Sequence, residues 1–268
     1  VMSETIEKNL GIKVDKLTGG YDVVLLNHNT TVARYLHLNR PLRKLFAMGM
    51  KSKSQVWQSV HGTIPELEQP FNSPRVRFLS ISEEIKLHLQ TEYGIESEVI
   101  YNPINVLDFA SAEIHDDCKI VYSLSQSEEF NEILSSICSE RSLQFSFNDK
   151  HTNPTNSVHE RMKDADVVFS LGRGCYEAMA MGKNVIVADM RHYMENVMDG
   201  MVESDSFIQF RKCNCSGRFS KIPISREQLH RELNKYKKGQ GARNRKLILD
   251  EHHVKIVVDN ILERVQTS

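Results

Sequence analysis

The chain has 268 residues, of which 40% are hydrophobic and 26% charged, and its formal net charge is -1. This balance provides no global field toward nucleic acid or membrane, and no apolar run approaches the roughly 20 residues that span a bilayer. The N-terminus has no signal-peptide pattern, and the odd number of cysteines favours reduced thiols. We therefore expect a cytoplasmic protein without a transmembrane segment.

Short apolar runs alternate with amphipathic stretches in the N-terminal part of the chain. The pattern predicts strands over 22–26, 56–60, 76–81 and 99–101, and a helix over 83–92 that ends near Gly94. Asn102-Pro103 is a strong breaker of regular structure, so we place a junction there.

The rhythm of strands and helices restarts after Pro103. Strands are predicted over 119–124, 143–147, 166–170 and 185–188, with helices over 128–140, 158–163 and 175–181 between them. Strands about 20 residues apart with intervening helices are typical of parallel βαβ units and a doubly wound sheet. Two further helices are predicted over 225–236 and 246–265.

These elements predict an α/β protein of two Rossmann-like domains that face a cleft, with a reduced N-terminal domain. We expect an N-terminal, acceptor-side domain over 1–104 and a C-terminal, nucleotide-sugar-binding domain over 105–248. Residues 249–268 are expected to form a helix that packs back toward the N-terminal domain. Clefts between domains are common ligand sites.

The most informative stretch runs from Asp164 to Ala188 and reads DADVVFSLGRGCYEAMAMGKNVIVA. A strand ends here in a glycine-bearing turn, Gly172-Arg173-Gly174, that leads into a helix. A helix N-terminus and a forked guanidinium both suit phosphate oxygens, and Glu177 could accept hydrogen bonds from a ribose diol. The alternative is a plain turn with a surface arginine and a helix-capping glutamate.

This stretch resembles the donor-binding motif of family-4-like GT-B glycosyltransferases. In that family GR-x-x-x-EAMA-x-G-x-x-V follows an ADVV strand, as Gly172, Arg173 and Glu177-Ala178-Met179-Ala180 do here. The resemblance implies that the turn with Gly172, Arg173 and Gly174 binds the donor diphosphate. It implies that Glu177 holds the nucleotide ribose.

Other segments resemble the same family in the expected order. The interdomain junction is matched by Ile81-Ser82-Glu83, Gly94-Ile95 and the run from Val99 to Asn105, VIYNPIN. Val60-His61-Gly62 resembles the N-domain HG turn, and the loop after Asp22 to Leu26 resembles an H-x-T-T loop. The tail is similar to an uncharacterised bacterial and phage subgroup at 199–202, 216–218 and 241–245. The resemblance covers the chain from about Tyr21 onward.

Two positions depart from the family pattern. The better-known members carry a glutamate eight residues before the second one, and this chain has Phe169 there. They also carry an arginine and a lysine on the loop after the first C-domain strand, which here reads SLSQSE over 123–128. Neutralisation of the diphosphate is therefore expected to rest on Arg173, the helix N-terminus and Arg218.

Two histidines follow predicted strands of the N-terminal domain. His28 and His61 would both lie at the carboxyl edge of a parallel sheet, where sites form. Either could hydrogen-bond a sugar hydroxyl or the charge that develops at the reacting centre. The alternative is that backbone groups in a loop satisfy each ring. The resemblance implies that His61 faces the sugar.

A basic stretch precedes the second predicted strand. Between Asp22 and Glu66 the chain has no acidic residue. Such a stretch is either a solvated basic face or a surface for an anionic acceptor, a phospholipid-linked glycan at a membrane surface or hydroxymethylated DNA. The candidate acceptor-side residues are Arg40, Arg43, Lys44, Lys51 and Lys53.

The expected function is transfer of a sugar, with retention, from a nucleotide-diphosphate sugar to a glycan, a lipid-linked acceptor or a modified nucleic acid. A UDP-sugar is the expected donor, with no cofactor and no metal, because Cys213-x-Cys215 has no partner pair at ligand spacing. One alternative is a degenerate GT-B module that binds a nucleotide sugar or a partner without turnover. Another is a GT-B-like sugar-nucleotide epimerase.

Overall fold

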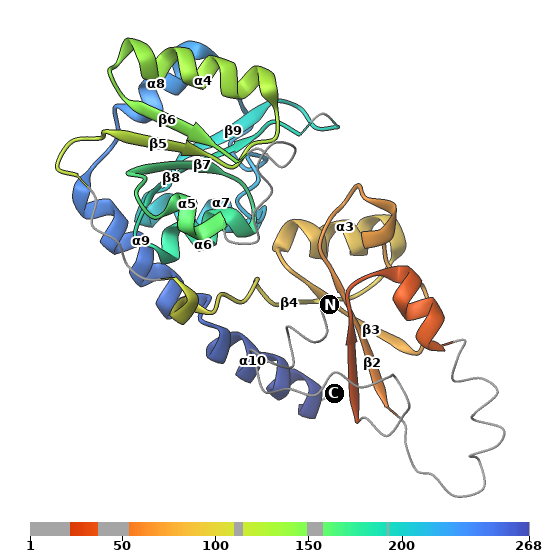
Figure 1. Ribbon diagram of the computed structural model, residues 1–268. Helices are drawn as coiled ribbons and strands as arrows, with labels where there is room; N and C mark the ends of the chain where they lie inside the picture. The colour runs from red at the N-terminus through yellow and green to blue at the C-terminus, as the bar shows by residue number, and fades with distance from the viewer. Residues whose placement is uncertain (1–21, 37–53, 110–114, 149–157, 192, 268) are drawn as a thin grey trace, which may run out of the picture. The chain divides into compact units, whose positions relative to one another are not determined.

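A computed structural model describes residues 22–36, 54–109, 115–148, 158–191 and 193–267 (Figure 1). The chain is an α/β protein with a parallel sheet and a mixed sheet, as expected from its alternating strands and helices. It divides into two compact units. Unit 1 comprises Val1–Leu79 and Leu89–Glu98, and unit 2 comprises Ser80–His88 and Val99–Ser268. Residues 99–104 and the last helix thus cluster with unit 2.

The N-terminal sheet has four strands in the order β1-β2-β3-β4. β1 and β2 run parallel, with Val24 opposite Val56. Residues 29–36 are helical and follow β1, as a βαβ unit requires. The strands and helices of this part of the chain are β1 (Val23–Leu26), β2 (Gln55–Val60), η1 (Glu66–Glu68), β3 (Val76–Ser80), α3 (Glu83–Tyr93), β4 (Glu98–Val99) and η2 (Val106–Asp108).

The second sheet has six strands in the order β10-β9-β8-β7-β5-β6. Its parallel part, β8-β7-β5-β6, confirms the predicted βαβ units. β9 pairs antiparallel with β8, and β10 pairs antiparallel with β9, so the sheet is mixed. The strands are β5 (Ile120–Ser123), β6 (Gln144–Phe147), β7 (Val167–Ser170), β8 (Asn184–Asp189), β9 (Val197–Met201) and β10 (Ile222–Pro223).

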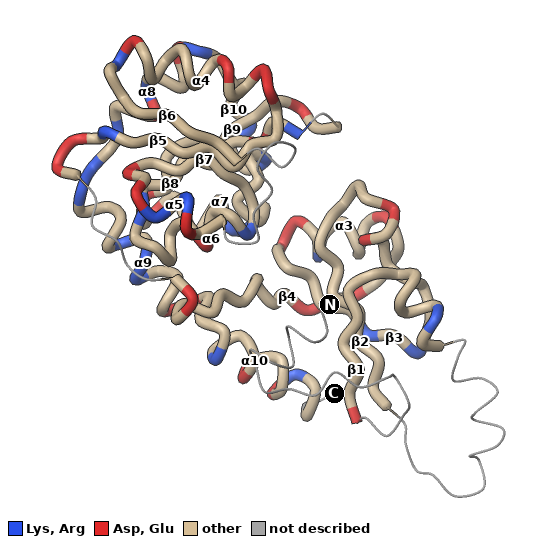
Figure 2. The backbone as a smooth tube through the Cα atoms, viewed as in Figure 1, with Lys and Arg blue, Asp and Glu red and all other residues tan. Residues whose placement is uncertain are grey.

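Helices cover both faces of this six-stranded sheet (Figure 1). Charged residues mark the outer helices α4 and α8, whereas β7 carries none (Figure 2). α4 and α8 lie on one face, and α5, α6, α7 and α9 lie on the other. The helices are α4 (Glu128–Glu140), α5 (Val158–Met162), α6 (Arg173–Ala180), α7 (Ser204–Lys212), α8 (Arg226–Leu233), α9 (Lys238–Glu251) and α10 (Val254–Thr267).

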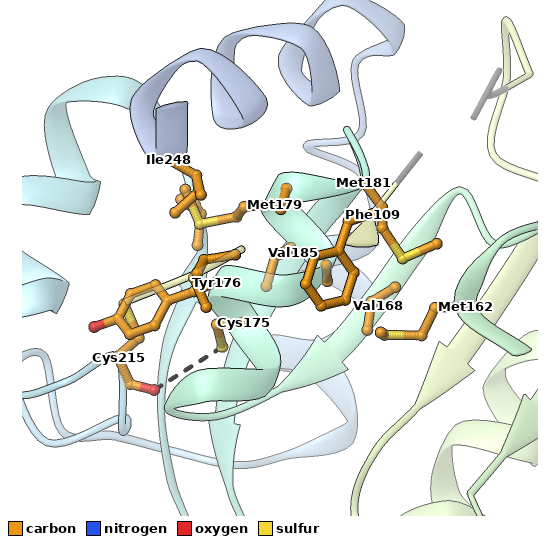
Figure 3. Close-up of a cluster of buried hydrophobic side chains, with 14 of the residues drawn as sticks. Phe109, Met162, Val168, Cys175, Tyr176, Met179, Met181, Val185, Cys215 and Ile248 are labelled. Atoms are coloured by element: carbon orange, nitrogen blue, oxygen red, sulfur yellow. Dashed lines mark hydrogen bonds between the residues drawn. The ribbon is translucent and has the colours of Figure 1, made fainter. Parts of the chain in front are cut away.

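Two buried clusters form the core of unit 2 and follow from the alternation of side chains along its strands. Val167 and Phe169 of β7 pack with α4 and α8, whereas Val168 packs with α5, α6 and α9. Figure 3 shows the second cluster, in which Tyr176 and Met179 of α6 lie among side chains from several elements. α6 is therefore held firmly, and its N-terminus has a fixed position at the sheet edge.

Several elements differ from the sequence-based predictions. α6 begins at Arg173, two residues before the predicted start, because Gly172 takes the N-cap position with φ of 55°. The single helix predicted over 246–265 is two helices, α9 and α10. The chain breaks between them because Ile104 forms a β-bridge with His253, with backbone hydrogen bonds to its neighbours His252 and Val254. β9 and α7 were not predicted.

Candidate functional site

A pocket of about 600 Å³ lies in unit 2 where β5, β7 and β8 end. α4 leaves β5 on one face of the sheet and α6 leaves β7 on the other, so this is a topological switch point, the usual ligand site of open α/β sheets. The lining residues are Leu124, Ser125, Gln126, Ser127, Glu129, Phe130, Phe169, Ser170, Leu171, Gly174, Ala188, Met190, Arg191, Met194 and Asn196.

The loop after β5 satisfies many of its own backbone groups. The hydroxyl of Ser123 accepts the N–H of Ser125 at 3.2 Å, and the hydroxyl of Ser125 accepts that of Ser127 at 3.1 Å. Ser127 is the N-cap of α4, and its Oγ accepts the N–H of Phe130 at 3.3 Å. These three serine hydroxyls hold the backbone of the loop in place. They also accept N–H groups that could otherwise bind an anion.

Glycine is required at the two positions of the predicted donor turn for different structural reasons. Gly172 has φ of 55°, a conformation that L side chains rarely adopt. A Cβ on Gly174 would lie 2.4 Å from the Oγ of Ser170 and 2.9 Å from Leu124, so close packing within the protein requires this glycine. Because the N-cap residue Gly172 has no side chain, no side-chain hydrogen bond caps the N-terminus of α6. Gly174 lines the pocket. The first turn of α6 thus starts at the pocket without a side-chain cap.

Arg173 and Glu177 pair with each other. The Nε of Arg173 donates to Oε1 of Glu177 at 2.7 Å, one turn apart on α6. The arginine side chain is 65% exposed and that of Glu177 is 22% exposed. Neither residue is among those that line the pocket. The two predicted donor-binding side chains are therefore brought together on the surface of α6, beside Gly174 in sequence.

Arg218, the second predicted donor cation, is held by carboxylates. Its Nε and Nη2 donate to the two oxygens of Glu84, in the Ser80–His88 segment of unit 2, at 2.7 and 2.6 Å. Its Nη1 lies 3.7 Å from Oδ2 of Asp189. Burial acts to lower the pKa of Arg218, but the bonds to Glu84 outweigh it and raise that pKa. Arg218 is not among the pocket-lining residues.

An ion pair at the pocket was missed by sequence reasoning. Asp189, the fully buried last residue of β8, accepts the Nε of Arg191 at 2.9 Å and its Nη2 at 2.6 Å. The hydrogen bond to Asp189 raises the pKa of Arg191 above its usual value. Arg191 lines the pocket. Arg191 lies three residues after the end of the strand predicted over 185–188, but only the order of the strands shows that this strand ends at the pocket.

Phe169, which stands where better-known family members have a glutamate, is buried in β7. It lines the pocket, and its ring meets that of Phe130 edge-on at 5.8 Å. Leu124, Leu171 and Met190 add to this apolar wall. The pocket lining therefore combines apolar side chains with hydroxyls, a carboxylate and a guanidinium.

The two predicted histidines lie in unit 1, where β1 and β2 end side by side. The exposed His28 accepts the N–H groups of Thr31 and Val32 on its backbone carbonyl and so begins the helix at 29–36. Burial and the nearby charge of His28 lower the pKa of His61. The Nε2 of His61 is buried and has no hydrogen-bond partner among the described residues. His61 thus favours the neutral imidazole near pH 7, with an Nε2 that the described residues leave unpaired.

The predicted basic stretch with Arg40, Arg43, Lys44, Lys51 and Lys53 lies outside the described residues. Among the residues that the structure does describe, no group of three or more His, Cys, Asp and Glu side chains could hold a metal ion. Burial raises the pKa of the Cys213 thiol to about 11. Within the same described ranges, every helix is too short or too polar to cross a membrane.

No protein-family model matches the chain, and no curated protein matches it in sequence.

Proposed function

We propose that the chain is a retaining glycosyltransferase of the GT-B type that uses a nucleotide-diphosphate sugar. The observation that carries this proposal is the pocket at the switch point between β5 and β7, which begins at Gly174 in the first turn of α6. A helix N-terminus without a side-chain cap favours an anion such as a diphosphate. The resemblance of the stretch from Asp164 to Ala188 to the family's donor motif supports the same site.

In this proposal the donor diphosphate lies toward the first turn of α6, and the nucleotide ribose hydrogen-bonds Glu177. Glu177 would then share its carboxylate between the ribose and Arg173, which now holds it at 2.7 Å. A UDP-sugar is the expected donor. No dedicated protein base is required, since in retaining enzymes of this type the leaving phosphate takes the proton of the acceptor.

The histidines of unit 1 are proposed for the acceptor side of the reaction. A neutral His61 with a free Nε2 can donate or accept a hydrogen bond, which suits a sugar hydroxyl. Its burial keeps the ring uncharged, so it would not compete for the diphosphate. The anionic acceptors proposed from the basic stretch are a phospholipid-linked glycan, with the protein at the membrane surface, and hydroxymethylated DNA.

A second candidate function is a degenerate module that binds a nucleotide sugar without turnover. Phe169 favours it, because a buried apolar ring occupies the position of a glutamate that the better-known enzymes carry. Binding would survive in such a module while catalysis is lost. Measurement of turnover separates the two functions.

The test is release of nucleoside diphosphate from a panel of UDP-, GDP-, ADP- and CDP-sugars. Glycosyltransferase activity predicts release from one donor class, greatly reduced in Glu177→Ala and in Arg173→Ala. Arg226→Ala is the matched control, because this arginine forms an exposed pair with Glu140 on the α4 and α8 side of the sheet. Binding of the same donors with no release would favour the degenerate module, and release that survives in both α6 variants would reject the assigned site.

A further inference from the structure

The cations that the sequence predicted for the donor site are already paired with carboxylates of the protein. Arg173 is paired with Glu177, and Arg218 donates two hydrogen bonds to Glu84. The loop after β5 has no basic residue over 123–128, and its serines accept several of its own N–H groups. A bound diphosphate needs a cationic hydrogen-bond donor in the pocket itself.

Arg191 meets this requirement by position. Of the described residues that line the pocket, it is the one with a cationic side chain. The lining residue Glu129 carries the opposite charge, so the pocket without Arg191 would repel an anion. Arg191 lies two residues after Asp189, the last residue of β8. It lines the pocket together with Ser125, Ser127 and Gly174.

The fork of Arg191 is oriented before any ligand binds. Nε and Nη2 donate to the two oxygens of the buried Asp189, and Nη1 donates to the hydroxyl of Tyr193 at 3.2 Å. A guanidinium has five N–H groups, so three are engaged by these described residues and two are left for a ligand. The guanidinium also stacks 5.2 Å from the ring centroid of Tyr193. An arginine held on one edge loses little side-chain entropy when it binds an anion on the other.

We propose that Arg191, oriented by Asp189, is the arginine that binds the diphosphate of the donor, in place of the cations that this chain lacks on the loop after β5. This inference rests on the proposed function, because it assumes that the pocket takes a nucleoside diphosphate. It assigns to the loop after β8 a role that the resemblance places elsewhere. Arg191 therefore discriminates a diphosphate from a bare nucleoside.

The experiment is calorimetric titration of the full chain with UDP, GDP, ADP and CDP, followed by the monophosphate and the nucleoside of the tightest binder. The variants are Arg191→Gln, the double variant Asp189→Asn with Arg191→Gln, and the control Arg226→Gln. The double variant removes both members of the ion pair, so it leaves no unpaired buried carboxylate and keeps the test open if the single variant unfolds. Circular dichroism establishes that each variant is folded.

Loss of charge-assisted hydrogen bonds is expected to raise Kd for the diphosphate by about 10- to 100-fold in both Arg191 variants. The Kd for the nucleoside should stay within about twofold, and the control should match the wild type. Equal diphosphate affinity in the wild type and in a folded Arg191 variant would overturn the inference and leave the proposed function standing. A wild type that binds none of the four diphosphates would reject the proposed function, and the inference with it.

Discussion

Each unit has an edge where parallel strands end, and the two edges carry different chemistry. In unit 1, β1 and β2 lead to His28 and His61, and the Nε2 of His61 is buried without a partner among the described residues. In unit 2, β5, β7 and β8 lead to a pocket with Arg191, whose guanidinium is paired with Asp189. The same position in an α/β sheet thus offers a neutral ring in one unit and an oriented cation in the other.

This difference indicates what each edge can bind. An arginine held by a carboxylate stays charged and keeps its direction, which suits a phosphate. A half-buried histidine such as His61, whose pKa is lowered by desolvation, favours the uncharged form near pH 7, which suits a hydroxyl group. Variants of these residues test the difference between the two edges, and their expected effects decrease from the buried ion pair to the exposed one.

The largest effect is expected from Asp189→Asn, which removes the buried partner of Arg191. The variant leaves two cations without this buried carboxylate, Arg191, which is 33% exposed, and Arg218, whose Nη1 lies 3.7 Å from Asp189, so the free energy of unfolding should fall by about 4 kcal/mol. Urea unfolding measures it. The double variant with Arg191→Gln should recover much of this loss, and an unchanged urea midpoint in the single variant would show that the pair does not hold this edge.

A buried histidine of unit 2 predicts a loss of stability in acid. Burial lowers the pKa of His252 to about 4, and its Nε2 has no partner among the described residues. Because the unfolded state binds the proton more tightly, the histidine's contribution is complete above pH about 6.5 and is lost as pH falls toward 4, a change of about 3 kcal/mol. His252→Phe, which keeps a ring against Tyr176, should flatten the dependence between these values in pH-dependent urea unfolding. An equally steep decline in this variant would assign the acid sensitivity to other groups.

The glycines of the donor turn should differ in their tolerance of alanine. Gly174→Ala meets Ser170 and Leu124 below 3.0 Å and should cost about 2 kcal/mol of unfolding free energy. Gly172→Ala would place its Cβ in ordinary contact with Asn214, 3.5 Å from Nδ2, but its φ of 55° is strained for an L residue and should cost about 1 kcal/mol. Thermal unfolding compares them with Gly239→Ala, an exposed position in the first turn of α9 that should be neutral or slightly stabilising. The reverse order for Gly172 and Gly174 would contradict this packing.

The smallest effect is expected from Arg226→Ala, which removes an arginine far in sequence from the pocket residues. Its partner Glu140 is 53% exposed and Arg226 is 43% exposed, so the loss should be about 0.5 kcal/mol. Chemical unfolding gives this baseline for the arginine variants. A loss as large as that of Asp189→Asn would remove the distinction between buried and exposed pairs on which the comparison rests.

Much of the fold of unit 2 was predictable because its apolar runs are short and regularly spaced. α4 has the predicted bounds, since Ser127 is a strong N-cap before an amphipathic run. β9 was missed because Asp199 and Gly200 are typical of turns. In the structure Asp199 is buried and accepts the N–H groups of Gly217 and Ser220, so tertiary contacts override the local signal.

The site was predictable only where a local pattern marks it. The turn with Gly172 and Gly174 could be read from the chain, because glycines between a strand and a helix are conspicuous. The pairing of Arg173 with Glu177 has the i, i+4 spacing of a helix, but the helix was predicted to begin only at 175. The pairing of Arg218 with Glu84 could not be read from the chain, since it depends on which side chains the fold brings within reach. Arg191 was missed for the same reason, because the significance of its position depends on the order of the strands.

The central claim is that the pocket of unit 2 binds a nucleoside diphosphate, and thermal unfolding with UDP, GDP, ADP and CDP tests it most directly. At a ligand concentration about 100 times Kd, one diphosphate should stabilise the wild type by about 2.7 kcal/mol, with a much smaller effect in Arg191→Gln and a full effect in Arg226→Gln. Absence of stabilisation by any of the four, at millimolar concentration and in a folded protein, would contradict the claim.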